Sequence, residues 1–143
     1  MDADSMKREA AQRALQFVED GMIVGLGTGS SAAQFIDLLG EKVSDGLNIT
    51  GVATSAATER QARAAGITLT TLDEEPEIDL NDDGAHDIHQ SHTLIKGGGC
   101  ALLRENIVES ASEMVVFISD HSKLVERLGA FPLPVEVEPF GYK

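Results

Sequence analysis

The stretch that decides the fold is Met22-Ile23-Val24-Gly25-Leu26-Gly27-Thr28-Gly29-Ser30-Ser31-Ala32. Residues 22–26 form a short apolar run that predicts a buried strand. A glycine-rich turn follows, and then a helix from about Ser31 to Leu39, stopped by Gly40. Glycines in such a turn let the backbone approach an anion closely, and the start of the helix offers free N–H groups. The stretch predicts a tight turn and, in the reading we favour, a phosphate cradle built from Thr28, Gly29, Ser30 and Ser31.

The same turn also fits the dinucleotide-binding fingerprint G-x-G-x-x-A over residues 27–32. That fingerprint needs an acidic residue at the end of the next strand, where it holds a ribose hydroxyl. The next predicted strand, Ile49 to Ala53, runs instead into Thr54 and Ser55. NAD is therefore disfavoured, and the lack of a G-K-[ST] sequence excludes a nucleotide P-loop.

Patterns typical of helices and strands alternate along the rest of the chain. We expect helices over residues 6–18, 56–65, 101–112 and 122–128, strands over residues 67–72 and 114–119, and an extended end from Phe131 to Val135. Residues 74–91 are acidic and poorly periodic. The order predicts an α/β fold with an open, mainly parallel, Rossmann-like sheet flanked by helices, in a single domain over residues 1–143. Ligands bind beyond the carboxyl ends of the strands in such sheets.

Composition narrows the classes of function. The chain has 143 residues, 42% of them apolar, with no apolar run long enough to cross a membrane and no secretory signal. The formal charge of −13 argues against binding a nucleic-acid backbone and resembles the acidic surfaces of proteins from salt-loving organisms. Cys100 is the only cysteine, so no internal disulfide can form. We expect a soluble cytoplasmic protein whose phosphate site is built locally, against a negative overall field.

A second glycine-rich segment, Lys96-Gly97-Gly98-Gly99, leads into the predicted helix that carries Glu105. Consecutive glycines usually mark backbone that passes close to another group, and Lys96 brings a fixed cation to the same place. A carboxylate beside a lysine and a phosphate cradle suits proton abstraction next to a carbonyl group. The ordinary alternative for Glu105 is a solvated glutamate on a helix surface.

Two further clusters follow predicted strands. Lys123 comes soon after the buried strand at residues 114–119, where it could hold a phosphate or a sugar, or lie in solvent. The segment Asp82-Asp83-Gly84-Ala85-His86-Asp87, with His89 and His92, has the composition of a polar surface turn. Its sharper alternative is a metal site, because three histidines lie close together in the sequence beside aspartates.

Taken in order, these segments resemble the ribose-5-phosphate isomerase type A family. The matching segments are residues 23–33, 53–55 and 83–85, Leu94-Ile95-Lys96-Gly97-Gly98-Gly99, Ala101-Leu102-Leu103-Arg104-Glu105, Ser119-Asp120-His121-Ser122-Lys123, and Phe131-Pro132-Leu133-Pro134-Val135-Glu136-Val137. The likeness covers nearly the whole chain. No single segment is decisive, but the segments together, in this order, are specific to the family. It implies isomerisation of ribose 5-phosphate and ribulose 5-phosphate in the pentose phosphate pathway, without metal or coenzyme, by a homodimer or homotetramer.

The resemblance also implies roles for individual residues. Glu105 would move a proton between C2 and C1 through a cis-enediol, Asp83 would help to open the sugar ring, and Lys96 would stabilise the enediolate oxygen with N–H groups of residues 97–99. The implied substrate-binding set, which includes no metal ligand, is Thr28, Gly29, Ser30, Ser31, Asp83, Gly84, Ala85, His86, Lys96, Gly97, Gly98, Gly99 and Lys123.

Two departures from the family pattern bear on activity. The family motif is Asp-Gly-Ala-Asp, and the last position here is His86, while Asn81 and Asp82 stand where the family has apolar strand residues. Family members continue well beyond Lys143, so the chain is expected to lack the family's C-terminal α/β subdomain. The alternatives are therefore a non-catalytic sugar-phosphate-binding domain, or a metal-binding variant that uses His86, His89 and His92.

Overall fold

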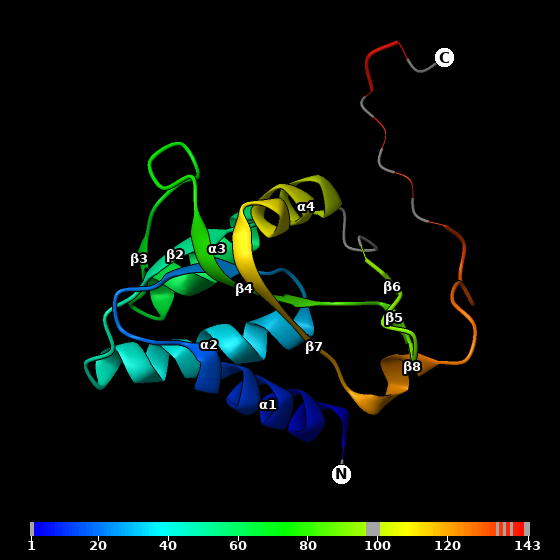
Figure 1. Ribbon diagram of the computed structural model, residues 1–143, viewed down its shortest axis with the longest axis horizontal. Coiled ribbons are helices and arrows are strands. Elements are labelled where there is room, and N and C mark those ends of the chain that lie inside the picture. The colour runs from blue at the N-terminus through cyan, green and yellow to red at the C-terminus, as the bar shows by residue number, and fades with distance from the viewer. Residues whose placement is uncertain (1, 97–100, 134, 136, 138, 142–143) are drawn as a thin grey trace.

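A five-stranded parallel sheet forms the centre of the protein (Figure 1). The computed structural model describes residues 2–96, 101–133, 135, 137 and 139–141. The strands lie in the order β3 (Thr68–Leu69), β2 (Thr50–Ala53), β1 (Ile23–Leu26), β4 (Ile78–Gly84) and β7 (Ser112–Ile118), and neighbouring strands are parallel. The predicted α/β class with an open parallel sheet is therefore confirmed.

Helices cover both faces of this sheet. α1 (Ala3–Ala14), which continues into η1 (Leu15–Phe17), packs against α2 (Ser30–Ser44), and α2 packs against α3 (Ala56–Ala64). α4 (Leu102–Ser110) packs on β4 and β7 and lies on the opposite side from α1 and α2 (Figure 1). Within the part of the chain that the structure describes, no helix has both the length and the apolar character needed to cross a membrane.

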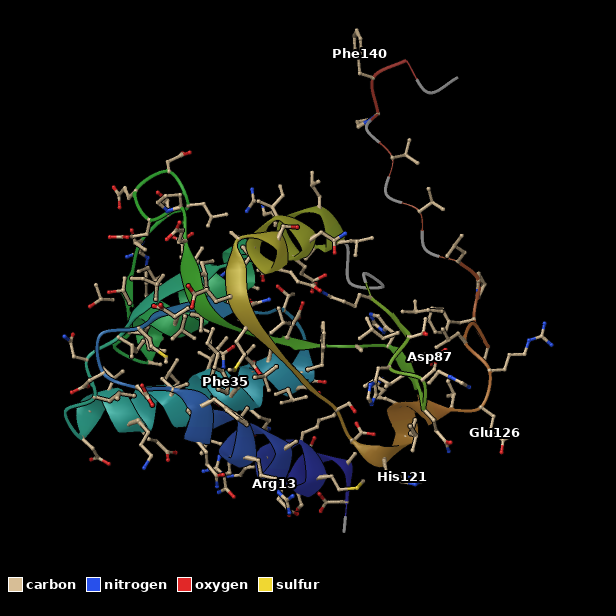
Figure 2. All side chains as sticks on the ribbon, viewed as in Figure 1. Arg13, Phe35, Asp87, His121, Glu126 and Phe140 are labelled. Atoms are coloured by element: carbon tan, nitrogen blue, oxygen red, sulfur yellow. The ribbon has the colours of Figure 1, made fainter. Side chains whose placement is uncertain are left out.

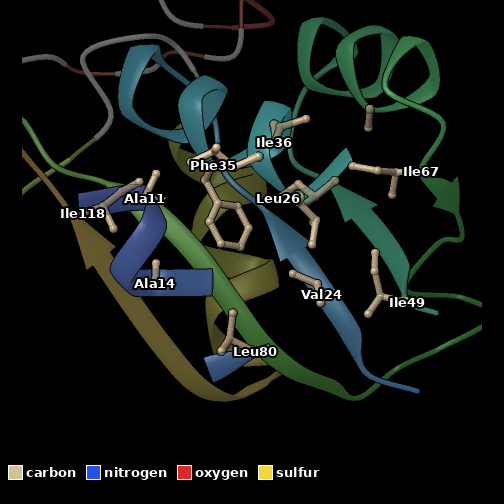
Figure 3. Packing of buried hydrophobic residues seen from close by; sticks show 13 residues of the cluster. Ala11, Ala14, Val24, Leu26, Phe35, Ile36, Ile49, Ile67, Leu80 and Ile118 are labelled. Carbon is tan, nitrogen blue, oxygen red and sulfur yellow. The ribbon is translucent and has the colours of Figure 1, made fainter. Parts of the chain in front are cut away.

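The main hydrophobic core lies between the sheet and the helices α1 and α2. Figure 2 shows Phe35 inside the molecule, whereas the side chain of Phe140 lies near the end of the C-terminal segment and is 91% exposed. Phe35 belongs to α2 and packs in one cluster with Val24 and Leu26 of β1 and Leu80 of β4 (Figure 3). A smaller cluster on the α4 side contains Val52, Ile78 and Val108. Packing on both faces holds the strand ends, and the polar residues that follow them, in place.

Two of the predicted helices have the wrong extent. α2 does not stop at Gly40 but continues through it. A Cβ at Gly40 would lie 2.7 Å from the Cβ of Ala65, so this glycine lets α2 pack closely against the end of α3. The helix predicted over residues 122–128 is only the short turn η2 (His121–Lys123), after which the chain enters the strand β8 (Leu124–Val125).

A second, three-stranded sheet lies beyond the carboxyl end of β4 (Figure 1). β5 (Asp87–His89) pairs antiparallel with β6 (Leu94–Ile95) and parallel with β8. Asp87 is buried, and its Oδ2 accepts a hydrogen bond of 3.0 Å from the N–H of Gly129, which ties the loop after β8 to β5. This small sheet holds the residues next to β6 and β8, Lys96 and Lys123, at the same end of the main sheet.

The central strand β4 lies in the acidic segment, where the local pattern predicts no element and the family resemblance implies a strand at Asn81 and Asp82. Asn81, Asp82 and Asp83 are no more than 1% exposed, so β4 is a buried strand although these three residues are polar. Both carboxyl oxygens of Asp82 are buried without a hydrogen-bond partner among the described residues. Burial, and after it the charge of Asp83, raises the pKa of Asp82 well above its ordinary value of 3.8. The folded protein therefore favours the protonated form of this carboxyl group.

We expect the substitution Asp82→Val to raise the free energy of unfolding at pH 8 by about 1–4 kcal/mol, as seen when apolar residues replace buried ion pairs. The folded chain favours protonated Asp82, while the unfolded chain ionises it above pH 3.8, so the parent loses stability as the pH rises above that value. The gain of the variant should therefore be smaller at pH 4 than at pH 8. Denaturant unfolding at both pH values measures the gain, and Asp45→Val, at an exposed position, is the control. An Asp82→Val protein that is less stable than the parent at both pH values would contradict the prediction.

Candidate active site

A cavity of about 120 Å³ lies at the carboxyl ends of β1 and β4. Its lining residues are Thr28, Gly29, Ser30, Ser31, Gly84, Ala85, His86, Lys96, Glu105 and Lys123. All ten belong to the set that the sequence predicts, although they come from distant segments of the chain. Asp83, which is also predicted, is buried beside the cavity in contact with Lys96. The predicted N–H donors at residues 97–99 lie outside the residues that the structure describes.

Hydroxyl groups hold the turn between β1 and α2. Thr28 Oγ1 lies 2.8 Å from Thr54 Oγ1 and donates a hydrogen bond of 3.0 Å to Ser55 Oγ. Thr58 Oγ1 donates a hydrogen bond of 2.9 Å to the carbonyl oxygen of Gly27. Thr54, Ser55 and Thr58 are absent from the cavity lining, so these hydroxyls support the turn and do not face a ligand.

The predicted phosphate cradle combines a helix N-terminus with two lysines. Gly29 is the N-cap of α2 and has no side chain to occupy the N–H groups of the first helical turn. Lys123 lines the cavity from the end of η2. Lys7 of α1 donates a hydrogen bond of 3.1 Å to Ser30 Oγ, and its side chain is only 15% exposed. Lys7 could not be found from the sequence, because no local pattern shows that α1 packs beside this turn.

Two carboxylates and an aromatic ring surround the ammonium group of Lys96. Its Nζ lies 2.8 Å from Oδ2 of Asp83 and donates a hydrogen bond of 2.6 Å to Oε2 of Glu109. The same nitrogen lies 5.3 Å from the centroid of the Phe117 ring. Burial acts to lower the pKa of Lys96, but the contacts with Asp83 and Glu109 outweigh burial and raise the pKa above its ordinary value. Lys96 is therefore a fixed positive charge in the cavity wall.

Burial raises the pKa values of two acids at the site. Glu105 is 6% exposed, and burial together with the charge of Asp83, opposed by Lys96, raises its pKa to about 7. Its Oε2 has no hydrogen-bond partner among the described residues. Burial also raises the pKa of Asp83, against the opposing effect of Lys96. A cavity-lining glutamate that titrates near neutral pH can take up a proton and give it back, as a general base must.

Glu109 is a second residue of the site that sequence reasoning missed. It lies on α4 four residues after Glu105, so the two side chains share one face of the helix. That spacing could have identified it, but carboxylates four residues apart are also common on solvated helices.

Two of the three histidines of the alternative metal site, His86 and His89, contact different groups. His86 lines the cavity, its backbone N–H donates to the carbonyl oxygen of Ile95, and its ring packs edge-on against Phe131 with the centroids 5.9 Å apart. His89 Nδ1 lies 2.7 Å from Ser91 Oγ instead. Across the described ranges, no group of three or more His, Cys, Asp or Glu side chains could hold a metal ion. The metal-binding alternative therefore gains no support from this arrangement.

The chain is similar in sequence to type A ribose-5-phosphate isomerases. Residues 50–143 match the family described as ribose 5-phosphate isomerase A (phosphoriboisomerase A). The ribose-5-phosphate isomerase A of Methylorubrum extorquens is 59% identical over 99% of this chain and 60% of its own length. That of Nitrobacter hamburgensis is 57% identical over 99% of this chain and 61% of its own length. The chain thus spans about three fifths of the length of these curated relatives.

Solved structures share the fold. A D-ribose-5-phosphate isomerase in complex with phospho-erythronic acid matches 90% of this chain and 57% of its own, with 42% identity and a TM-score of 0.87. The ribose 5-phosphate isomerase A of Methanocaldococcus jannaschii matches 89% of this chain and 57% of its own, with 40% identity and a TM-score of 0.85. A translation initiation factor from Pyrococcus horikoshii resembles the fold alone, at 20% identity and a TM-score of 0.61.

We expect the carboxyl group of Glu105 to titrate with a pKa of about 7, measured by NMR from its side-chain ¹³C resonance. Lys96→Met should raise this pKa further, because the ammonium group favours the carboxylate form. Asp83→Asn should lower it, because a neighbouring negative charge is removed. Asp45→Asn, at the exposed far end of α2, is the control for the loss of one negative charge. A titration near the ordinary value of 4.5 would show that the carboxyl group is not buried in this way.

Proposed function

The chain belongs to the ribose-5-phosphate isomerase A family, and we propose that its cavity binds ribose 5-phosphate and interconverts it with ribulose 5-phosphate. The observation that carries this proposal is the meeting of Glu105, Asp83 and Lys96 beside a phosphate cradle at a single cavity. The reaction would serve the pentose phosphate pathway in the cytoplasm, and the family resemblance favours a homodimer or homotetramer.

In this proposal the phosphate group lies at the N-terminal turn of α2. Ser30 and Ser31 offer hydroxyl and N–H donors there, and Lys7 and Lys123 offer positive charge. The chain carries a formal charge of −13, so it can attract a phosphate only through such local groups. The complex of a similar isomerase with phospho-erythronic acid supports a phosphorylated ligand for this chain as well.

Glu105 would take the proton from C2 of the open-chain sugar. The electrons of the broken C–H bond form the C1–C2 double bond, and the carbonyl oxygen on C1 becomes the oxyanion of a cis-enediolate. The positive charge of Lys96 in the cavity wall can stabilise that oxyanion. Return of the proton to C1, with transfer of the O2 proton to O1, gives the ketose without an oxidant or a cofactor. Asp83, in contact with Lys96, would exchange a hydroxyl proton while the furanose ring opens.

A non-catalytic sugar-phosphate-binding domain is the second candidate. The observation that favours it is His86, which lines the cavity where the family motif has an aspartate. A neutral imidazole offers one acceptor and one donor, whereas a carboxylate offers acceptors alone. Sugar hydroxyls that donate to a carboxylate would therefore lose a partner in this chain, and binding could persist without turnover.

Calorimetry and an isomerase assay separate the two candidates. We expect ribose 5-phosphate to bind and to be converted. We expect NAD not to bind, because Thr54 and Ser55 follow β2 where a dinucleotide site needs an acid. Binding without conversion would establish the non-catalytic candidate. Measurable NAD binding with no sugar-phosphate binding would contradict both.

The substitution Glu105→Gln should lower turnover by about 10²–10⁴-fold and leave phosphate binding nearly unchanged, because glutamine keeps the shape but cannot take a proton. In the parent, turnover should rise as the pH increases through about 7, since the ionised form of Glu105 is the base. Steady-state rates between pH 5.5 and 8.5 measure both effects. Glu113→Gln, at an exposed position of β7, is the matched control. Parent-like turnover in Glu105→Gln would mean that another group abstracts the proton.

The substitution His86→Asp should raise turnover, because a carboxylate at this part of the cavity wall can accept hydrogen bonds from sugar hydroxyls. His89→Asp makes the same chemical change on β5, at a residue absent from the cavity lining, and should leave turnover unchanged. The measurement is kcat and KM for ribose 5-phosphate in the parent and in both variants. An equal or lower kcat/KM in the His86→Asp protein would show that His86 is tolerated or useful.

A further inference from the structure

We propose that Glu109 is a positioning residue that orients the ammonium group of Lys96 at the cavity. The inference rests on the proposed function for its catalytic consequence, whereas the contact between the two side chains is a property of the fold alone. Lys96 Nζ donates a hydrogen bond of 2.6 Å to Glu109 Oε2, across 13 residues of sequence. The Lys96 side chain is 6% exposed and that of Glu109 is 33% exposed.

The two carboxylates near Lys96 contact it from different elements of the fold. Oδ2 of Asp83, on the central strand β4, lies 2.8 Å from Nζ in a buried ion pair, and Glu109 lies on α4. Glu109 receives a directed hydrogen bond. An ammonium group carries three N–H donors at fixed angles to one another, so the bond to Glu109 limits where the other two can point. Glu109 therefore shares with Asp83 the orientation of the ammonium group, which it contacts from α4.

The other groups around Lys96 cannot replace this directed contact. Among the described residues, Asp83 and Glu109 are the acidic side chains within 4.0 Å of the ammonium group. The Phe117 ring of β7, 5.3 Å away, attracts a cation but does not fix the directions of its N–H bonds. Glu105, on the same helix as Glu109, contributes its negative charge at a greater distance. Without Glu109, the ammonium group would be drawn toward Asp83 alone.

Glu109 acts through Lys96, because it is absent from the residues that line the cavity. A shift of the ammonium group toward Asp83 would move the positive charge away from a developing oxyanion. The closer ion pair would also hinder Asp83 from exchanging the proton proposed for ring opening. Misplacement of a catalytic group by about 1 Å can cost as much as about 10²-fold in rate. Removing the charge of Glu109 should also lower the pKa values of Lys96 and Glu105, because that charge raises both.

The test uses Glu109→Ala, Glu109→Gln and the matched control Glu113→Gln in the full 143-residue chain. NMR titration follows the ¹³Cε resonance of Lys96, assigned with Lys96→Arg, and the carboxyl resonance of Glu105. Both pKa values should fall in the two Glu109 variants and stay at the parent values in Glu113→Gln. With ribose 5-phosphate, kcat should fall about tenfold in Glu109→Ala with little change in KM. The loss should be smaller in Glu109→Gln, whose amide oxygen can still accept the Lys96 hydrogen bond.

Unchanged titrations of Lys96 and Glu105 in Glu109→Ala would overturn the proposal, whatever the turnover. Shifted titrations with parent-like turnover in both variants would overturn the catalytic consequence. The proposed function fails separately, if the parent neither binds nor converts ribose 5-phosphate, and the titrations would still decide whether Glu109 holds Lys96. Denaturant unfolding of each variant confirms that the comparison is made on folded protein.

Discussion

The ammonium group of Lys96 is the one positive charge described next to three carboxyl groups at the carboxyl end of β4. Lys96 contacts Asp83 and Glu109, and Glu105 lines the same cavity outside the described ion pairs. One positive charge cannot compensate three carboxylates, and burial adds a cost for the charged forms of Asp83 and Glu105. Burial raises the pKa of Asp83 and, together with the charge of Asp83, raises that of Glu105 to about 7. Burial beside the charge of Asp83 is thus what makes Glu105 suitable as a base near neutral pH.

The part of the site beside the N-terminus of α2 is positively charged. There the N-terminus of α2 and the two lysines Lys7 and Lys123 come together in a chain with a formal charge of −13. The buried acids Asp83 and Glu105 belong to β4 and α4, whereas Lys7 and Lys123 come from α1 and η2, where the buried Asp120 lies 3.9 Å from Lys7 Nζ. A sugar phosphate has the matching polarity, with an anion at one end and exchangeable protons at the other.

Much of this arrangement could be predicted because its polar residues follow apolar strands. β1 and β7 are apolar runs, and the residues after β1 formed a recognisable turn motif. The local pattern alone could not predict β4, because Asn81, Asp82 and Asp83 interrupt its apolar residues. Lys7 and Glu109 were missed for another reason. Their partners lie 23 and 13 residues away, so the contacts arise from tertiary packing. Tertiary pairing with β5 likewise makes residues 124–125 a strand where the local pattern favours a helix.

The two adjacent aspartates of β4 differ because side chains alternate across a strand. Asp82 shares a face with Leu80, which packs in the core beneath α1 and α2, so its carboxyl group meets apolar neighbours and favours the protonated form. Asp83 points to the α4 side, and β4 pairs it with Phe117, whose ring lies beside the Lys96 ammonium group. A slip of one residue would exchange the two carboxyl groups and leave Lys96 without its buried partner. The packing of Leu80 in the core beneath α1 and α2 sets this register, so the hydrophobic core itself selects which aspartate reaches Lys96.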